Sequence, residues 1–265
     1  MKKVLTIAGS DSGGGAGIQA DLKTFMAFGT HGMSAITAVT AQNTVGVQAA
    51  HALSVGLIKA QIQSVAEDIG VDAVKTGMLS GSEIVRAVAE SVEAYSLPNL
   101  VVDPVMIAKS GDPLLAEEAR LTIRDELLPL ATVITPNLHE ASALLDAEIA
   151  TIADMEDAAR ELHHLGCSWV VVKGGHLTGD EAVDVIYDGE KIFREEAPYI
   201  QSKNTHGTGC TFSSAIAANL AKGYDPLESI RIAKRFISEA IRTGIDIGAG
   251  HGPTNHLVGW ESQWR

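Results

Sequence analysis

Residues 204–211 read Asn-Thr-His-Gly-Thr-Gly-Cys-Thr, and a helical pattern follows them directly from Phe212 to Lys222. Glycine lets consecutive backbone N–H groups turn toward one point, and the N-terminal end of a helix adds a partial positive charge there. The stretch therefore predicts a cradle for an anion, and phosphate is the anion we expect. A plainer interpretation stays open, in which the glycines only allow a turn before a helix and Cys210 is buried and inert.

Cys210 would lie in the first turn of this helix. A thiol in that position usually has a lowered pKa, because the helix N-terminus stabilises the thiolate. Cys210 is therefore a candidate base beside the phosphate site.

On both sides of the cradle, short apolar segments alternate with segments whose apolar residues recur at helical spacing. The first kind predicts buried strands and the second predicts helices packed on a sheet. The expected strands are 4–8, 33–39, 71–75, 100–102, 132–135 and 169–173, with a hairpin formed by 183–187 and 191–195 around Asp188-Gly189. One expected helix starts at Ile18 and stops at Gly29, another runs from the Ser54 cap to Val65, and the others cover 82–94, 115–128, 138–145, 155–165, 208–222 and 226–243.

This alternation predicts an α/β fold with a mostly parallel central sheet and helices on both faces. With 265 residues and no linker, low-complexity tract or internal repeat, the chain is expected to form a single domain over residues 1–265. Ligands of such sheets bind outside the carboxyl ends of the strands. Six residues at or just past expected strand ends should therefore share one rim: Gly9, Gln42, Met78, Asp103, Asn137 and Lys173.

The composition restricts the partners of the protein. A formal net charge of −13 argues against nonspecific binding to nucleic acid or to an anionic membrane. The two cysteines, Cys167 and Cys210, have no metal-ligand spacing and indicate a reducing compartment, by default the cytoplasm. No stretch approaches the ~20 apolar residues of a membrane span, and the apolar run after Lys3 meets Asp11 too early for a secretion signal, so we expect a protein that is not exported.

Two common nucleotide-binding motifs are not supported. Residues 15–20 fit a loose dinucleotide fingerprint, but a loop from Gly9 to Gly14 separates them from the preceding strand. The second strand also ends in Gln42-Asn43, where the fingerprint expects an acidic ribose ligand. The chain contains no Gly-Lys-Ser or Gly-Lys-Thr, so it is not a P-loop protein. If it binds ATP, it does so with another fold.

Four residues near the expected rim each have two interpretations. Asn137 and Glu140 can form a helix cap, in which each side chain satisfies the other's backbone amide, or they can hold a hydrated Mg²⁺, which prefers oxygen ligands. Asp103 is either linked to that metal or a turn residue before a proline. Lys173 ends an apolar strand and is either a phosphate contact or an ordinary solvated lysine.

Taken together, these motifs resemble those of the ribokinase superfamily, and within it the hydroxymethylpyrimidine and phosphomethylpyrimidine kinases of thiamine biosynthesis. The resemblance runs nearly end to end. It is carried by residues 8–24 (AGSDSGGGAGIQADLKT), 37–44 (TAVTAQNT), 75–79 (KTGML), 102–106 (VDPVM), 135–141 (TPNLHEA) and 172–176 (VKGGH), together with the cradle.

This resemblance implies a ribokinase-like fold and transfer of the γ-phosphoryl group of Mg-ATP. The acceptors would be the hydroxymethyl group of 4-amino-5-hydroxymethyl-2-methylpyrimidine and then the resulting monophosphate. In family terms Cys210 looks like the base, at a position where sugar kinases of the superfamily have an Asp. A homodimer is also implied.

The resemblance also assigns roles to individual residues. The anion hole would consist of Gly207, Thr208, Gly209 and Cys210. Gln42 would read the pyrimidine edge, and Asp21, Gly9, Met78 and Val105 would line the substrate pocket. Asp103 and Glu140 would organise magnesium, and Lys173, Asn137 and Thr205 would contact the nucleotide.

Two other functions stay open. One is a pyridoxal kinase, because relatives with the Cys cradle accept that ring. Gln42 favours the pyrimidine, since a carboxamide can pair both a ring nitrogen and an exocyclic amine, which pyridoxal lacks there. The other is a catalytically silent sensor that binds the pyrimidine without consuming ATP, although the joint presence of Cys210, Asp103, Glu140 and Lys173 favours an enzyme.

Overall fold

The computed structural model describes residues 1–106, 117–175 and 181–258, which contain one nine-stranded sheet. Its order is β3-β2-β1-β4-β5-β6-β7-β8-β9. The six central strands from β2 to β7 are parallel, whereas β3, β8 and β9 are attached antiparallel at the two edges. The strands are β1 (Lys3–Asp11), β2 (His31–Gln42), β3 (Val47–Ala52), β4 (Ala73–Thr76), β5 (Leu100–Val102), β6 (Val133–Ile134), β7 (Trp169–Val172), β8 (Glu181–Tyr187) and β9 (Ile192–Pro198).

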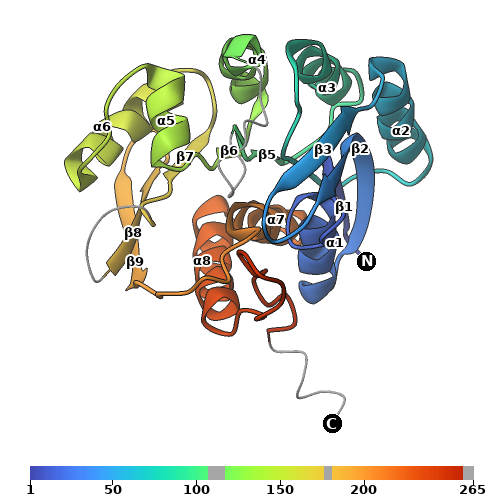
Figure 1. Ribbon diagram of the computed structural model, residues 1–265. Coiled ribbons are helices and arrows are strands. Elements are labelled where there is room, and N and C mark those ends of the chain that lie inside the picture. The colour runs from blue at the N-terminus through green and yellow to red at the C-terminus, as the bar shows by residue number, and fades with distance from the viewer. Residues whose placement is uncertain (107–116, 176–180, 259–265) are drawn as a thin grey trace.

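Helices cover both faces of the sheet, as Figure 1 shows. One face carries α2 (Val55–Asp68), α3 (Ser82–Ala94), α4 (Glu117–Thr122), α5 (Leu138–Leu145) and α6 (Ile152–His163). The other carries α1 (Gly17–Ala27), α7 (Thr208–Ala221) and α8 (Pro226–Arg242). The expected α/β fold with a mostly parallel sheet is confirmed.

The two faces have separate hydrophobic cores because side chains alternate along each strand. On β5, Leu100 and Val102 pack into the core beneath α2–α6, whereas Val101 packs into the core beneath α7 and α8. Strands buried on both faces read as continuous apolar runs, which is why the sequence shows them clearly.

Helix α7 is the central helix of its layer. All its residues from Thr211 to Ala221 are buried, and it packs against α1, α8 and strands β1, β4 and β5. This burial fixes the direction of the helix, so that its N-terminus and the cradle before it are held at the carboxyl ends of the central strands.

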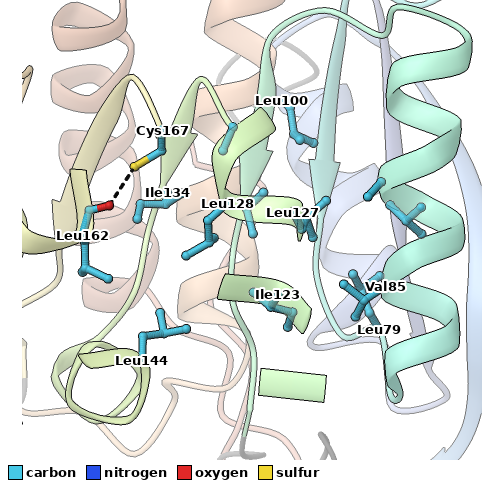
Figure 2. Close-up of a cluster of buried hydrophobic side chains, with 14 of the residues drawn as sticks. Leu79, Val85, Leu100, Ile123, Leu127, Leu128, Ile134, Leu144, Leu162 and Cys167 are labelled. Carbon is cyan, nitrogen blue, oxygen red and sulfur yellow. Dashed lines mark hydrogen bonds between the residues drawn. The ribbon is translucent and has the colours of Figure 1, made fainter. Parts of the chain in front are cut away.

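The larger core contains Cys167, as Figure 2 shows. Its thiol lies 3.5 Å from the carbonyl oxygen of Leu162, and burial raises its pKa to about 12. Cys167 is therefore a packing residue that stays protonated at neutral pH.

Several boundaries differ from the sequence-based expectation. Strand β3 is not indicated by the sequence, because five of its six residues are exposed and give no alternating pattern. Strand β1 continues to Asp11, since an irregularity between Ala8 and Ser10 bends the strand without ending it.

Two helices also differ in their ends. The helix expected over 155–165 spans Ile152–His163, because Thr151 and Asp154 form a capping box that starts it earlier. In the helix expected over 115–128, the first two residues lie outside the described part, and the chain changes from α4 to a π turn at Ile123–Leu127 and a 3-10 turn at Leu128–Leu130.

Within the described ranges, none of the helices has the length and apolar character needed to cross a membrane.

Candidate active site

A cavity of about 1020 Å³ lies at the carboxyl ends of the parallel strands. It brings together nearly all the residues that the sequence indicates. Those that line it are Gly9, Gln42, Met78, Asp103, Val105, Asn137, Glu140, Lys173, Thr205, Gly207, Thr208, Gly209 and Cys210.

The cradle is the start of α7, and its shape requires glycine at position 207. Gly207 is the N-cap of the helix and has a φ of 79°, a conformation that L side chains rarely adopt. A Cβ there would lie only 1.8 Å from the carbonyl oxygen of Gly15. Within the described residues the amides of Gly209 and Cys210 have no acceptor, so they are free to bind an anion.

The C-terminal segment holds the cradle from behind. The amide of His206 donates to the carbonyl of Gly252 at 3.0 Å, and that of Thr254 donates to the carbonyl of His206 at 3.3 Å. Thr211 shares a 2.9 Å hydrogen bond with Nε2 of His256, whose pKa burial lowers to about 4. The imidazole of His256 is therefore neutral at physiological pH, and the sequence alone assigned this segment no role.

Asp11 connects the cradle to the glycine-rich loop after β1, and the sequence alone does not indicate this. Its Oδ2 lies 2.8 Å from Nε2 of His206, and its carboxylate accepts hydrogen bonds from the amides of Gly13, Gly15 and Ala16. Burial tends to raise the pKa of Asp11, but these hydrogen bonds, led by that of His206, hold it below its ordinary value. Asp11 stays ionised and ties the two loops together.

Lys173, Asp103 and Glu140 form the charged wall of the cavity. The Lys173 ammonium lies 3.0 Å from Oδ1 of Asp103 and 4.0 Å from Oε2 of Glu140. Burial raises the pKa of Glu140 to about 7, the Lys173 charge opposes this rise, and Asp103 adds to it. The pKa of Lys173 is raised because the two carboxylates outweigh its burial. A Cβ on Gly209 would lie 3.4 Å from both Asp103 Oδ2 and Lys173 Nζ, so this wall faces the cradle.

The cap interpretation of Asn137 and Glu140 is confirmed. The amide of Asn137 donates to Oε2 of Glu140 at 2.8 Å, and the amide of Glu140 donates to Oδ1 of Asn137 at 2.9 Å. The same two residues line the cavity, so the cap also fixes where the Glu140 carboxylate points.

The part of the cavity at the end of β2 is separated from the charged wall by the intervening strands of the sheet. Gln42 lies at the end of β2, where its Oε1 accepts a hydrogen bond from the Thr40 hydroxyl at 3.1 Å, and Gly9, Met78 and Val105 also line the cavity. A carboxamide beside such small and apolar groups suits a flat heteroaromatic ring.

Asp21 does not line the cavity, contrary to the expectation from the resemblance. It is fully buried behind α7, where its carboxylate accepts hydrogen bonds from Thr6, Lys75 and Ser214. The sequence places Asp21 near the glycine-rich loop, but its position on the inner face of α1 turns it toward the sheet.

The expectation of a lowered thiol pKa at Cys210 is also wrong. Burial raises the pKa of Cys210 to about 11, and the carboxylates of Asp21 and Asp103 add to the rise. The Lys75 charge and a hydrogen bond involving the Gly17 amide lower it, but by less. The position in the helix therefore does not decide the ionisation, because desolvation is the larger effect.

A further polar pair lies in the cavity wall formed by α8. Lys234 donates to Asp184 at 2.8 Å and to the carbonyl of Ala182 at 3.0 Å, and Asp184 accepts from the amide of Gly174, next to Lys173. No motif in the sequence marks this pair. The one local signal is that Lys234 interrupts the buried face of an otherwise regular amphipathic helix.

Comparisons with solved structures place the fold in one class. The pyridoxal kinase of Bacillus subtilis in complex with ADP has a TM-score of 0.91 and 45% sequence identity, covering 97% of this chain and 98% of that chain. A phosphomethylpyrimidine kinase from Clostridium difficile has a TM-score of 0.82 and 48% identity, covering 91% and 100% of the two chains. The fold is that of a small-molecule kinase.

Sequence comparison gives the family. The hydroxymethylpyrimidine/phosphomethylpyrimidine kinase of Streptomyces coelicolor is 52% identical over 257 residues, which are 97% of this chain and 94% of that protein. The family model for phosphomethylpyrimidine kinase matches residues 11–255. The chain belongs to the phosphomethylpyrimidine kinase family.

Proposed function

We propose that this protein transfers the γ-phosphoryl group of ATP to 4-amino-5-hydroxymethyl-2-methylpyrimidine and then to the monophosphate formed. The observation that carries the proposal is a single cavity with two unlike sides. The free amides of Gly209 and Cys210 face the Lys173 ammonium and the two carboxylates of the charged wall, while Gln42 lies at the end of β2 on the other side. The relatives named for this reaction, and the ADP complex of a similar kinase, support the same assignment.

Phosphoryl transfer needs mainly positioning and stabilisation of the charge that spreads over the transferred group. The amides of Gly209 and Cys210 would bind the phosphoryl oxygens at the positive end of α7. Lys173 would neutralise a nucleotide phosphate, with Asn137 and Thr205 beside it at the cavity surface. The oxygens of the attacking hydroxyl and the departing ADP would then lie on opposite sides of the cradle.

Magnesium fits this site only through water and phosphate oxygens. Among residues 1–106, 117–175 and 181–258, no three His, Cys, Asp or Glu side chains could form a metal site of their own. Asp103 and Glu140 supply oxygen atoms of the kind Mg²⁺ prefers, and Mg²⁺ commonly keeps several waters. We therefore propose that they orient the water shell of an Mg-ATP complex, which would neutralise charge on the phosphates.

Cys210 is the proposed acceptor of the proton from the attacking hydroxyl. Its thiol has a pKa raised to about 11, so only a small thiolate fraction exists at neutral pH. This is compatible with catalysis if the transition state is loose, because little proton transfer is then needed before the phosphoryl group moves.

Gln42 is the proposed reader of the ring. Its carboxamide can donate to one ring atom and accept from an exocyclic amine, as an aminopyrimidine requires. Pyridoxal kinase is the second candidate function, and it is favoured by the TM-score of 0.91 to the B. subtilis pyridoxal kinase.

An ATP-consumption assay with Mg²⁺ separates these functions. The purified protein is given hydroxymethylpyrimidine, its monophosphate or pyridoxal at equal concentrations. Turnover of the first two well above pyridoxal is the expected result. A preference for pyridoxal would replace the substrate assignment, and tight pyrimidine binding without ATP consumption would indicate a sensor.

We also propose that residues 1–265 act as one kinase domain, that the protein is a homodimer, and that it works in the cytoplasm. The domain proposal rests on the one continuous sheet of the described residues, and the location on the use of ATP and the two free thiols. The dimer rests on the family resemblance, and light scattering during gel filtration measures it directly.

A further inference from the structure

Lys75 and Asp21 form a charged pair that is sealed from solvent. Both side chains have 0% exposure, and the Lys75 ammonium lies 3.0 Å from each carboxylate oxygen of Asp21. Asp21 also accepts a 2.6 Å hydrogen bond from Thr6 and a 2.7 Å hydrogen bond from Ser214. The carboxylate thus joins α1, β1, β4 and α7 at one point.

This point lies directly behind the cradle. Ser214 is one helical turn after Cys210 on α7, so the bond to Asp21 fixes the first turn of that helix against the sheet. On β4, Lys75 precedes the turn that leads to Met78 at the cavity, and a Cβ on Gly77 would lie 2.8 Å from the ammonium. Neither Lys75 nor Asp21 lines the cavity.

The position of the pair matters more than its contribution to stability. A buried ion pair gives little net stabilisation over apolar residues, because removing two charges from water costs about as much as their attraction returns. A fixed charge in a low-dielectric interior, however, acts strongly on a neighbouring group that can ionise. The charged groups that act on Cys210 are Lys75 from β4, Asp21 from α1, Asp103 after β5 and Lys173 after β7.

We propose that Lys75 and Asp21 are positioning residues of the phosphoryl-transfer reaction. The Lys75 ammonium, held in place by Asp21, favours negative charge at Cys210 and at the adjacent cradle, while Asp21 anchors α7. Neither residue touches a substrate. The effect of the pair on catalysis rests on the proposed function. Its effect on the ionisation of Cys210 does not, because that effect exists in the protein without substrate.

Two substitutions in the pair separate an electrostatic role from a purely structural one. Lys75→Met removes the positive charge, whereas Asp21→Asn removes the negative charge and keeps the shape. Both break a buried pair and should lower the melting temperature. Their effects on the Cys210 thiolate should be opposite, because one charge stabilises the thiolate and the other opposes it.

The measurement is the rate of alkylation by iodoacetamide at Cys210, followed by mass spectrometry at pH 8 without ATP or acceptor. We expect Lys75→Met to slow it about tenfold, the change produced by one pKa unit, and Asp21→Asn to accelerate it. Cys167, with 1% exposure, should not react unless the protein unfolds and serves as the internal control.

Thr6→Val is the matched control variant, since it removes a hydrogen bond to Asp21 without changing any charge. Its alkylation rate should stay close to that of the wild type. If Lys75→Met does not fold, the double variant Lys75→Met/Asp21→Asn replaces it, and its rate should be below that of the wild type. Equal rates in all variants, or changes in the same direction for Lys75→Met and Asp21→Asn, would overturn the proposal.

Catalysis provides a second readout. Because Lys75 lies outside the cavity, Lys75→Met should lower kcat and leave KM for ATP nearly unchanged. A failure of the pyrimidine assignment would leave the alkylation result standing, so the two proposals can fail independently.

Discussion

Two lysine–carboxylate clusters lie near the first turn of α7, and they face different surroundings. Lys173, with Asp103 and Glu140, opens on the cavity and has a side chain that is 17% exposed. Lys75, with Asp21, is fully buried between the sheet and two helices. We therefore propose two uses for the same chemistry, in which the Lys173 ammonium, which a ligand can reach, binds phosphate, whereas the sealed Lys75 ammonium acts only on the protein around it.

The backbone explains this difference. Lys173 follows the last residue of β7, so its side chain reaches the strand-end edge where ligands bind. Lys75 is the third residue of β4, two positions after Ala73, and it shares with Ala73 the sheet face that α7 covers. A lysine just past the end of a strand therefore reaches the cavity, whereas a lysine within a strand is covered by the helix that packs on it.

The largest expected effect comes from the exposed cluster. Lys173→Met should lower kcat/KM for ATP about 10³-fold, because a charge that stabilises the transferred group is lost. The melting temperature should fall less than in Lys75→Met, since the Lys173 side chain is partly exposed and Glu140 can take up a proton when the ammonium is absent. Steady-state kinetics and thermal unfolding measure both quantities. If Lys173→Met lowers the melting temperature strongly but leaves kcat/KM for ATP unchanged, Lys173 acts on the protein and not on the ligand.

Cys210 lies between the two clusters. Cys210→Ala should lower kcat by about 10²-fold, the usual size of a lost general base. The raised thiol pKa gives a second signature. The thiol loses its proton as pH rises toward about 11, so kcat of the wild type should increase between pH 7 and 9 and that of the variant should not. Turnover near that of the wild type in Cys210→Ala would show that the thiol is not the base.

Gln42, at the end of β2, is the proposed contact of the substrate ring and belongs to neither lysine–carboxylate cluster. Gln42→Leu should raise KM for hydroxymethylpyrimidine about 30-fold, equivalent to about 2 kcal/mol of lost hydrogen bonding. The KM for ATP should stay unchanged, because Gln42 ends β2 and, in the described sheet, four strands separate β2 from β7, which Lys173 follows. If KM for hydroxymethylpyrimidine and KM for pyridoxal rise by the same factor, Gln42 does not recognise the exocyclic amine of the pyrimidine.

The smallest expected effect is a pH dependence within the exposed cluster. Glu140 has a pKa raised to about 7, so it gains a proton as pH falls through that value. A protonated Glu140 cannot orient the water shell of Mg²⁺, and kcat/KM for Mg-ATP should fall ~10-fold between pH 8 and 6. In Glu140→Gln, kcat/KM should not fall between pH 8 and 6, and it should be lower than that of the wild type at pH 8. If the variant keeps the pH profile of the wild type, Glu140 does not orient the water shell of Mg²⁺.

Much of the fold and site was open to prediction because the relevant signals are local. The two-residue period of strands, the helical spacing of apolar residues and the glycines of 204–211 each act over a few neighbours. The parallel arrangement then brings the ends of distant strands together, which is why Gln42, Asp103, Asn137 and Lys173 were expected to share one cavity and do line it.

Local patterns do not show which charges meet or how far they lie from water. Asp21 bonds Lys75 across 54 residues and Ser214 across 193, and His206 meets Asp11 across 195. Such pairs leave no local pattern, and the desolvation that raises the pKa of Cys210 depends on every element packed around it. The local sequence is enough to predict an α/β chain with an anion cradle at the carboxyl ends of its strands. Three-dimensional packing decides which charged groups near the cradle face the cavity and which are sealed behind it.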